Sequence, residues 1–392
     1  MKILVINKKN IDSIIRYVLP FCVAIMLTFM RGGFLFFSDQ YTVTDRIINI
    51  TVVFIAAIMV IRSSKSSYRR EDVKLYIPLM LYLYWIIIHL IMAWYRQPVN
   101  ASQIITITVA IVLSINMRCS DLLMLRRSLV LINILFIIML AIYSPNVIRQ
   151  LSGGAFGVNE RFGQDHNPTA FVAYPRSMYI LSIACIGSSI IEKNMIVKAI
   201  SIIISAVPML IGLSTAGRGG LLGFITSITI IILGAIMVYG SKRKISLLFL
   251  ISFLCSGVYY IYKLIITRFP IMVYRIQNDA DDGRYDIWSQ ALNDITLFGK
   301  GPSYDYAHNL FLESLHDYGI IGFVLCILFV YTVIKGSIKT IRGGLDMEII
   351  IVMAIVMLQF VTQQLSLNIY WGFFWAAMVL PISLSIEKRK IL

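Results

Sequence analysis

The chain has 392 residues, of which 58% are hydrophobic and 14% charged, and its formal net charge is +15. Runs of about twenty apolar residues recur along its whole length, each long enough to cross a hydrocarbon core, which excludes a soluble globular fold. The basic residues are scattered over short segments and form no patch, which argues against a nucleic-acid partner.

The apolar runs predict an all-α integral membrane protein of about twelve transmembrane helices, with one polytopic membrane domain over residues 1–392. An even number of spans places both termini on one side of the membrane. Most of the 35 Lys and Arg residues fall in segments assigned to that side, which predicts cytoplasmic N- and C-termini. The expected spans are 14–30, 44–61, 75–95, 103–117, 129–144, 169–191, 198–213, 220–239, 246–266, 319–334, 349–365 and 369–386.

The cysteines and the acidic residues predict neither a metal centre nor a cofactor. Cys22, Cys185, Cys255 and Cys326 fall inside expected spans, which supports neither a disulfide framework nor a metal quartet. The acidic run 279–283 departs from the spacing of a calcium loop, and we interpret it as a solvated turn.

Three segments on the opposite, outer side carry the candidate functional residues. Two are long loops, 145–168 and 267–318, and the third is the short link 214–220 between two spans. Sites are commonly built on irregular chain between helices, and the positive-inside rule makes arginine unexpected in outer segments. Arginines in these three segments therefore need an explanation.

Each outer segment contains one arginine beside a glycine: Arg161, Arg218 and Arg284. Glycine lets a backbone approach a ligand closely, and a planar guanidinium matches phosphate oxygens in pairs, so three converging arginines would hold a diphosphate. Taken alone, each is also compatible with reaching lipid head groups or pairing with a local acid such as Glu160 or Asp282. Arg218 is the strongest candidate, since an arginine near membrane depth costs about 3 kcal/mol.

The stretch 307–322, AHNLFLESLHDYGIIG, contains two of the four histidines. His308 is expected to open a helix that re-enters the membrane, with His316 two turns further along the same face. A histidine at a polar membrane boundary is suited to accept a proton from a sugar hydroxyl, although it can equally bond water or a carbonyl. Of the other two, His89 is expected to bond a neighbouring helix and His166 to lie in a turn.

Aromatic residues are dense in the loop 267–318. Aromatic faces stack on sugar rings, but they also mark membrane interfaces, and the sequence leaves both interpretations open. Trp288 and Tyr306 are the substrate-binding candidates of this group. The full set is Tyr285, Trp288, Tyr304, Tyr306 and Tyr318.

Taken in order, the motifs from residue 214 to residue 335 resemble those of the O-antigen ligase and polymerase family, and the arrangement of about twelve spans extends the resemblance to the rest of the chain. Each motif is weak alone, but their order and common membrane depth are specific. They are Arg218-Gly-Gly-Leu-Leu222, the R-x-x-x-W of Arg284 to Trp288, the G-K-G-P of Gly299 to Pro302, His308-Asn309, and the G-x-x-G of Gly319 to Gly322.

The resemblance implies a metal-independent glycosyltransferase of the GT-C type in the bacterial inner membrane. Such enzymes work at the periplasmic face and take a glycan from undecaprenyl diphosphate, so 145–168 and 267–318 would be periplasmic loops. Arg218 and Arg284 match arginines that bind the donor diphosphate, whereas Arg161 matches only by its place in an outer loop. His308 matches the histidine proposed as catalytic base, and we take its neighbour Asn309 as a substrate-binding candidate.

The implied chemistry agrees with the residues. Arginines would neutralise the charge that develops on the diphosphate leaving group, a task for which no metal site is expected. His308 would deprotonate the acceptor hydroxyl as it attacks the anomeric carbon, inverting its configuration. The expected partners are the undecaprenyl-diphosphate-linked glycan, an acceptor glycolipid, membrane lipid and, as an open question, a chain-length regulator.

Polymerase and ligase differ in the acceptor, which is a lipid-linked repeat unit for one and lipid A core for the other. The short spacing from Gly299 to Ala307 and the tyrosine at position 306, where many ligases carry a second histidine, favour a polymerase. A ligase remains the alternative, as does a related capsule or exopolysaccharide enzyme. A lipid-linked oligosaccharide flippase is the alternative from another class, although the polar residues gather on one membrane face and the two halves show no symmetry.

Overall fold

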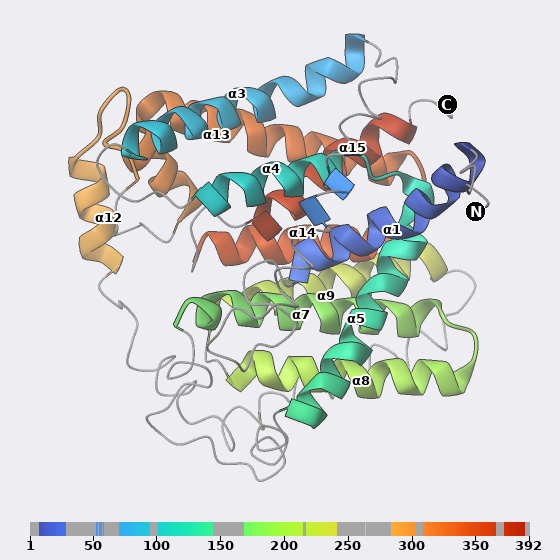
Figure 1. Cartoon of the computed structure of the whole chain (residues 1–392). Helices are drawn as coiled ribbons and strands as arrows, with labels where there is room; N and C mark the ends of the chain where they lie inside the picture. The colour runs from blue at the N-terminus through green and yellow to red at the C-terminus, as the bar shows by residue number, and fades with distance from the viewer. Residues whose placement is uncertain are drawn as a thin grey trace, which may run out of the picture.

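The computed structural model describes residues 8–28, 52–53, 55–56, 58, 70–94, 101–143, 168–214, 217–240, 263, 284–302, 309–365 and 372–388. Within these residues every regular element is a helix, and the helices form one bundle (Figure 1). They are α1 Lys8–Thr28, α3 Arg70–Trp94, α4 Ala101–Ile115, α5 Leu122–Tyr143, α7 Pro168–Ile191, α8 Met195–Ser214, α9 Arg218–Tyr239, α12 Arg284–Asn293, α13 Leu310–Arg342, α14 Met347–Gln363 and α15 Gly372–Lys388, with a 3-10 helix, Cys119–Asp121, before α5.

The predicted all-α class is confirmed, and each expected span except 44–61 and 246–266 falls on one of these helices. Those two fall on stretches of which the structure describes only isolated residues. Among the described residues, five helical segments are long and apolar enough to cross a membrane, and the remaining long helices are apolar over shorter stretches. The five are Lys74–Met92, Cys119–Ile142, Met195–Leu213, Arg218–Tyr239 and Leu310–Arg342.

The outer faces of these helices are apolar, which fits contact with lipid. Exposed side chains include Tyr84, Met92, Ile203, Met237 and Ile334 on four different helices. A soluble bundle would carry charged residues on such faces. The arrangement is compatible with a membrane protein, in which helices satisfy their backbone groups internally and turn apolar side chains toward hydrocarbon.

Helix α14 lies between α7 and α9 and is antiparallel to both. A Cβ atom added to Gly234 of α9 would lie 2.5 Å from Ile350 of α14, and one on Gly187 of α7 would lie 2.4 Å from Ile351. Near the middle of α14, Ser227 Oγ of α9 donates to Ala354 O at 2.7 Å. Small residues let membrane helices approach closely, where van der Waals contact and short polar bonds replace the hydrophobic effect.

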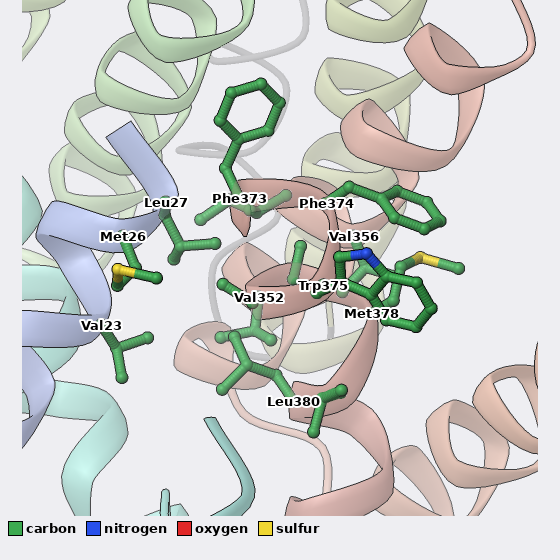
Figure 2. Packing of buried hydrophobic residues seen from close by; sticks show 14 of the residues in the cluster. Val23, Met26, Leu27, Val352, Val356, Phe373, Phe374, Trp375, Met378 and Leu380 are labelled. Atoms are coloured by element: carbon green, nitrogen blue, oxygen red, sulfur yellow. The ribbon is translucent and has the colours of Figure 1, made fainter. Parts of the chain in front are cut away.

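The apolar core is built around α15, which packs against α1 and α14, and Figure 2 shows side chains of all three helices in this core, among them Val23, Val352 and Trp375. Trp375 is fully buried and its ring lies 5.3 Å from that of Phe329 in α13 and 5.9 Å from that of Tyr82 in α3. Rings at these separations attract one another beyond their area of contact. This cluster fixes α3, α13 and α15 relative to one another.

The helix directions define two ends of the bundle, which we name after one arginine each. At the Arg218 end, α4, α7, α9, α13 and α15 begin and α1, α3, α5, α8 and α14 finish; α12 also lies there (Figure 1). Ser177 Oγ of α7 donates to Thr28 O of α1 at this end. The opposite end, the Arg126 end, holds the start of α1 and the finish of α15, as expected for an even number of spans.

Candidate functional site

Helix α9 begins with Arg218, directly after Gly217, whose backbone is extended at φ −79° and ψ 96°. No side chain caps this helix, and the next two residues, Gly219 and Gly220, are buried. The first N–H groups of a helix lack intrahelical partners and carry partial positive charge. A half-buried guanidinium at the same position adds to that charge. Such an arrangement favours an anion at the start of α9.

The start of α9 is held against the C-terminal end of α14. A Cβ atom on Gly223 would lie 2.9 Å from Thr362 Oγ1 and 3.0 Å from Leu358 O, so only glycine fits without displacing backbone. Thr362 Oγ1 itself donates to Leu358 O at 2.6 Å. The motif that begins at Arg218 therefore fixes the arginine beside the end of α14.

Asn309 holds the start of α13 at the same place. Its side-chain Oδ1 accepts hydrogen bonds from the backbone N–H groups of Phe311 at 3.0 Å and Leu312 at 3.2 Å, which is an N-cap. Its Nδ2 donates to Gln364 O, just past α14, at 3.4 Å. Arg218 and Asn309, far apart in sequence, therefore lie on two sides of the C-terminal end of α14. His308 directly precedes Asn309 in the chain.

Helix α12 begins with Arg284 and packs against α13 at the Arg218 end (Figure 1). Trp288 is half-buried, and its ring meets the exposed ring of Tyr285 edge to face, with centroids 5.8 Å apart. Two aromatic rings on an outer helix can stack on a sugar or lie at a membrane interface. The structure places Trp288 one helical turn after Arg284.

The G-K-G-P motif supports a break in α13. Backbone geometry at Gly319 is not helical, with φ 72° and ψ −171°, and a Cβ atom there would lie 2.3 Å from Gly299 N. The segment 296–301 crosses this break and pairs with it by four backbone hydrogen bonds. They run from Ile320 N to Thr296 O at 3.0 Å, Ile321 N to Leu297 O at 3.3 Å, Lys300 N to His316 O at 3.1 Å and Gly301 N to Asp317 O at 2.9 Å.

Helix α3 holds the first part of α13 from the other side. Tyr82 Oη shares a hydrogen bond with Ser314 Oγ at 2.6 Å, and Trp85 Nε1 donates to Tyr318 O at 2.9 Å. His89 Nε2 lies within hydrogen-bonding distance of Phe298 O. The sequence predicts that His89 bonds a neighbouring helix, whereas its Nε2 contacts the segment between α12 and α13. These contacts make His89 a structural residue.

Four ionisable side chains form two pairs in and beside the 296–301 segment. His316 Nδ1 lies 2.7 Å from Asp317 Oδ1, and Lys300 Nζ lies 2.7 Å from Asp294 Oδ2. The hydrogen bond from Lys300 lowers the pKa of the exposed Asp294 carboxyl below its ordinary value. His316 faces this local network, which holds the break in α13, and we assign it a supporting role.

Arg176 is a residue that the sequence analysis does not single out. Its side chain, in α7, is fully buried, its Nη2 donates to Gln363 Oε1 at 3.2 Å, and its guanidinium carbon lies 4.8 Å from the ring centroid of Phe373. The signal is present in the sequence, because an arginine inside the expected span 169–191 is costly and is commonly functional. Arg176 lies at the Arg218 end, since Gln363 is the last residue of α14.

The remaining candidates fall outside the described residues. Arg161, His166, Tyr306 and His308 are among them, and of Arg284 the structure describes the backbone only. Among the described residues, no group of three His, Cys, Asp or Glu residues is arranged to hold a metal ion.

A comparison with models of known protein families finds no match, and a comparison with curated proteins finds none either. The resemblance to the O-antigen ligase and polymerase family therefore rests on the motifs of this chain alone.

Proposed function

We propose that this protein is an O-antigen polymerase, or the polymerase of a related surface polysaccharide. It transfers an undecaprenyl-diphosphate-linked glycan to a hydroxyl of an acceptor lipid-linked repeat unit. In this proposal the chain spans the bacterial inner membrane about twelve times, both termini are cytoplasmic, and the Arg218 end of the bundle faces the periplasm.

One observation carries the proposal. The motif pieces beginning at Arg218 and at His308-Asn309 are separated by a long stretch of sequence, yet the structure holds Arg218 and Asn309 on two sides of the C-terminal end of α14. Arg284 begins α12 at this same end of the bundle. An uncapped helix start with an arginine suits a phosphate, and a helix entering the membrane after a histidine suits a hydroxyl at the interface.

The reaction uses these groups as follows. The acceptor hydroxyl oxygen forms a bond to the anomeric carbon of the donor glycan while the bond from that carbon to the diphosphate oxygen breaks. The hydroxyl proton passes to His308, and undecaprenyl diphosphate leaves with the bonding electrons. Arg218 and Arg284 stabilise the charge that accumulates on the leaving diphosphate. Attack opposite the leaving group inverts the anomeric configuration.

Deleting the gene and separating the lipopolysaccharide of the cells on a gel tests the proposal. Loss of a polymerase leaves core that carries one repeat unit. Core without any repeat, with accumulation of lipid-linked polymer, would identify a ligase instead. A complementing plasmid that carries His308→Ala is expected not to restore the ladder; restoration by that variant would contradict the enzymatic role.

A further inference from the structure

The outer half of the interface between α7 and α14 contains buried polar atoms that lack partners among the described residues. Arg176 is fully buried, and its Nε and Nη1 have no hydrogen-bond partner; only Nη2 is bonded, to Gln363 Oε1. Gln359, also fully buried, has a partner for neither amide atom. The other atoms of this kind on the two helices and the turn after α14 are Tyr179 Oη, Ser182 Oγ and Gln364 Nε2.

These atoms lie within about two helical turns of one another along the axis of the bundle. Helices α7 and α14 are antiparallel, with Arg176 beside Gln363 and Gly187 beside Ile351, so Gln359 lies about one turn below Gln363 and on a level with Ile180. The group therefore runs over about two turns from the end of α14 inward.

Arg176 lies just below Arg218. The ring of Tyr179 in α7 stacks on that of Phe224 in the parallel helix α9, with centroids 4.7 Å apart. Arg176 precedes Tyr179 by three positions and Arg218 precedes Phe224 by six. At a rise of roughly 1.5 Å per residue, the Arg176 backbone is about 4.5 Å deeper in the bundle than that of Arg218.

A guanidinium has five N–H donors and keeps its charge in proteins. Among the described residues it meets one amide oxygen and one aromatic face, and neither group carries a negative charge. A buried charge without an opposite charge is unstable unless another group neutralises it. An anion with several acceptor oxygens would match the paired donors of this guanidinium.

We propose that Arg176 binds a phosphate oxygen of a lipid-linked diphosphate from within the bundle, one level below Arg218. Gln359 and Gln364 supply amide donors to the same ligand. This inference rests on the proposed function, because a diphosphate at the interface, with its lipid tail in the bilayer, is the anion that reaches this depth. It makes Arg176 a donor-binding residue on a transmembrane helix, in addition to those in the outer segments.

The test measures the melting temperature of the full-length purified protein in detergent, with and without undecaprenyl diphosphate. Undecaprenol, which lacks phosphate, is the ligand control. The variants are Arg176→Met, which removes the charge and the donors but keeps a long side chain, and Arg176→Lys, which keeps the charge but lacks the paired N–H donors of the planar guanidinium. Arg342→Gln, at the opposite end of the same bundle, is the matched control.

Undecaprenyl diphosphate is expected to raise the melting temperature of the wild type and of Arg342→Gln, and undecaprenol to leave both unchanged. Arg176→Met is expected to weaken apparent binding by about 10- to 100-fold, and Arg176→Lys by less. Without ligand, Arg176→Met is expected to melt at the same or a higher temperature, since an uncompensated buried charge is removed. A purely structural arginine would give a lower value.

Each outcome decides between the two proposals. If the wild type responds and both Arg176 variants respond equally, the role of Arg176 is overturned while the proposed function stands. If the wild type does not respond, the proposed function fails, and the role of Arg176 fails with it. If Arg176→Met does not fold, the strength of the Arg176→Lys response alone decides the inference.

Discussion

The buried arginines at the two ends of the bundle have different neighbours. At the Arg126 end, the Arg126 guanidinium of α5 lies 3.6 Å from an oxygen of Glu192, directly after α7, and 3.5 Å from an oxygen of Glu348 in α14. At the Arg218 end, Arg176 meets an amide oxygen and a ring. Internal charge pairs hold helices together, whereas a charge left without its counter-ion is suited to take one from a ligand.

The starts of two helices, α14 and α9, differ in a similar way. At the Arg126 end, Asp346 caps α14 by accepting from Ile349 N at 2.8 Å. At the Arg218 end, α9 begins without a side-chain cap and with an arginine as its first residue. An acidic cap satisfies the positive start of a helix, and an arginine does not. This difference between the starts of α14 and α9 supports the proposed anion binding at the Arg218 end.

Arg218→Glu is expected to have the largest effect on activity. It reverses the charge that faces the proposed donor diphosphate, and glycan transfer is expected to fall by at least about 100-fold. A carboxylate also suits the start of a helix, so α9 is expected to remain folded. Transfer measured in reconstituted vesicles, together with the melting temperature, checks both parts. Loss of stability together with activity would mean that Arg218 is structural.

Arg126→Leu is expected to affect stability rather than activity. It leaves Glu192 and Glu348 without their shared cation; both carboxylates are partly exposed, so the cost is expected to be about 2–4 kcal/mol, below that of breaking a fully buried pair. Denaturation in mixed micelles measures the change, and activity per folded molecule is expected to be unchanged. A triple variant that also carries Glu192→Gln and Glu348→Gln is expected to regain much of the stability. Failure of the triple variant to regain it would remove the charge-pair explanation.

Gly319→Ala is expected to destabilise the protein by about 2–4 kcal/mol, since it combines an unfavourable φ with a clash. The added Cβ would lie 2.3 Å from Gly299 N and 2.4 Å from Leu297 O. Gly301→Ala is the matched control, because Gly301 has a similar φ of 84° but nothing within 4 Å of its Cβ position. The two melting temperatures separate the clash from the strain. Equal losses would show that the 296–301 segment does not pack on α13 as described.

The smallest expected effect concerns Asp294. Its pKa is lowered by Lys300, so the ion pair stabilises the folded state above the ordinary pKa of an aspartate and is lost as the pH falls through the lowered value. The melting temperature of Asp294→Asn, subtracted from that of the wild type, is expected to give a small difference at neutral pH that vanishes once the pH has fallen below the lowered pKa of Asp294. A difference that persists unchanged in acid would contradict this origin.

Sequence patterns predict most of this fold because membrane helices have a strong signal. A run of about twenty apolar residues specifies a helix with little help from tertiary contacts. The helix expected to open at His308 and the expected span 319–334 form one element, α13, which begins at Leu310. The break at Gly319 depends on hydrogen bonds from the distant segment 296–301, and no local pattern encodes such a pairing.

The site was predictable in part. Residues in recognisable motifs, such as Arg218 and Asn309, were found, and the structure brings these two to one helix end. Arg176 was not, because an arginine in an apolar run reveals its cost but not its surroundings. Only packing shows that its neighbours are an amide and a ring, whereas those of Arg126 are two carboxylates.

Reconstitution of the purified protein into lipid vesicles, with a lipid-linked repeat unit as the only substrate, tests the central claim most directly. Mass spectrometry of the extracted lipids is expected to detect undecaprenyl diphosphate carrying two or more repeat units with the wild type, and none with His308→Ala. Movement of the lipid-linked unit across the bilayer without any lengthening of the glycan would contradict the account and identify a transporter.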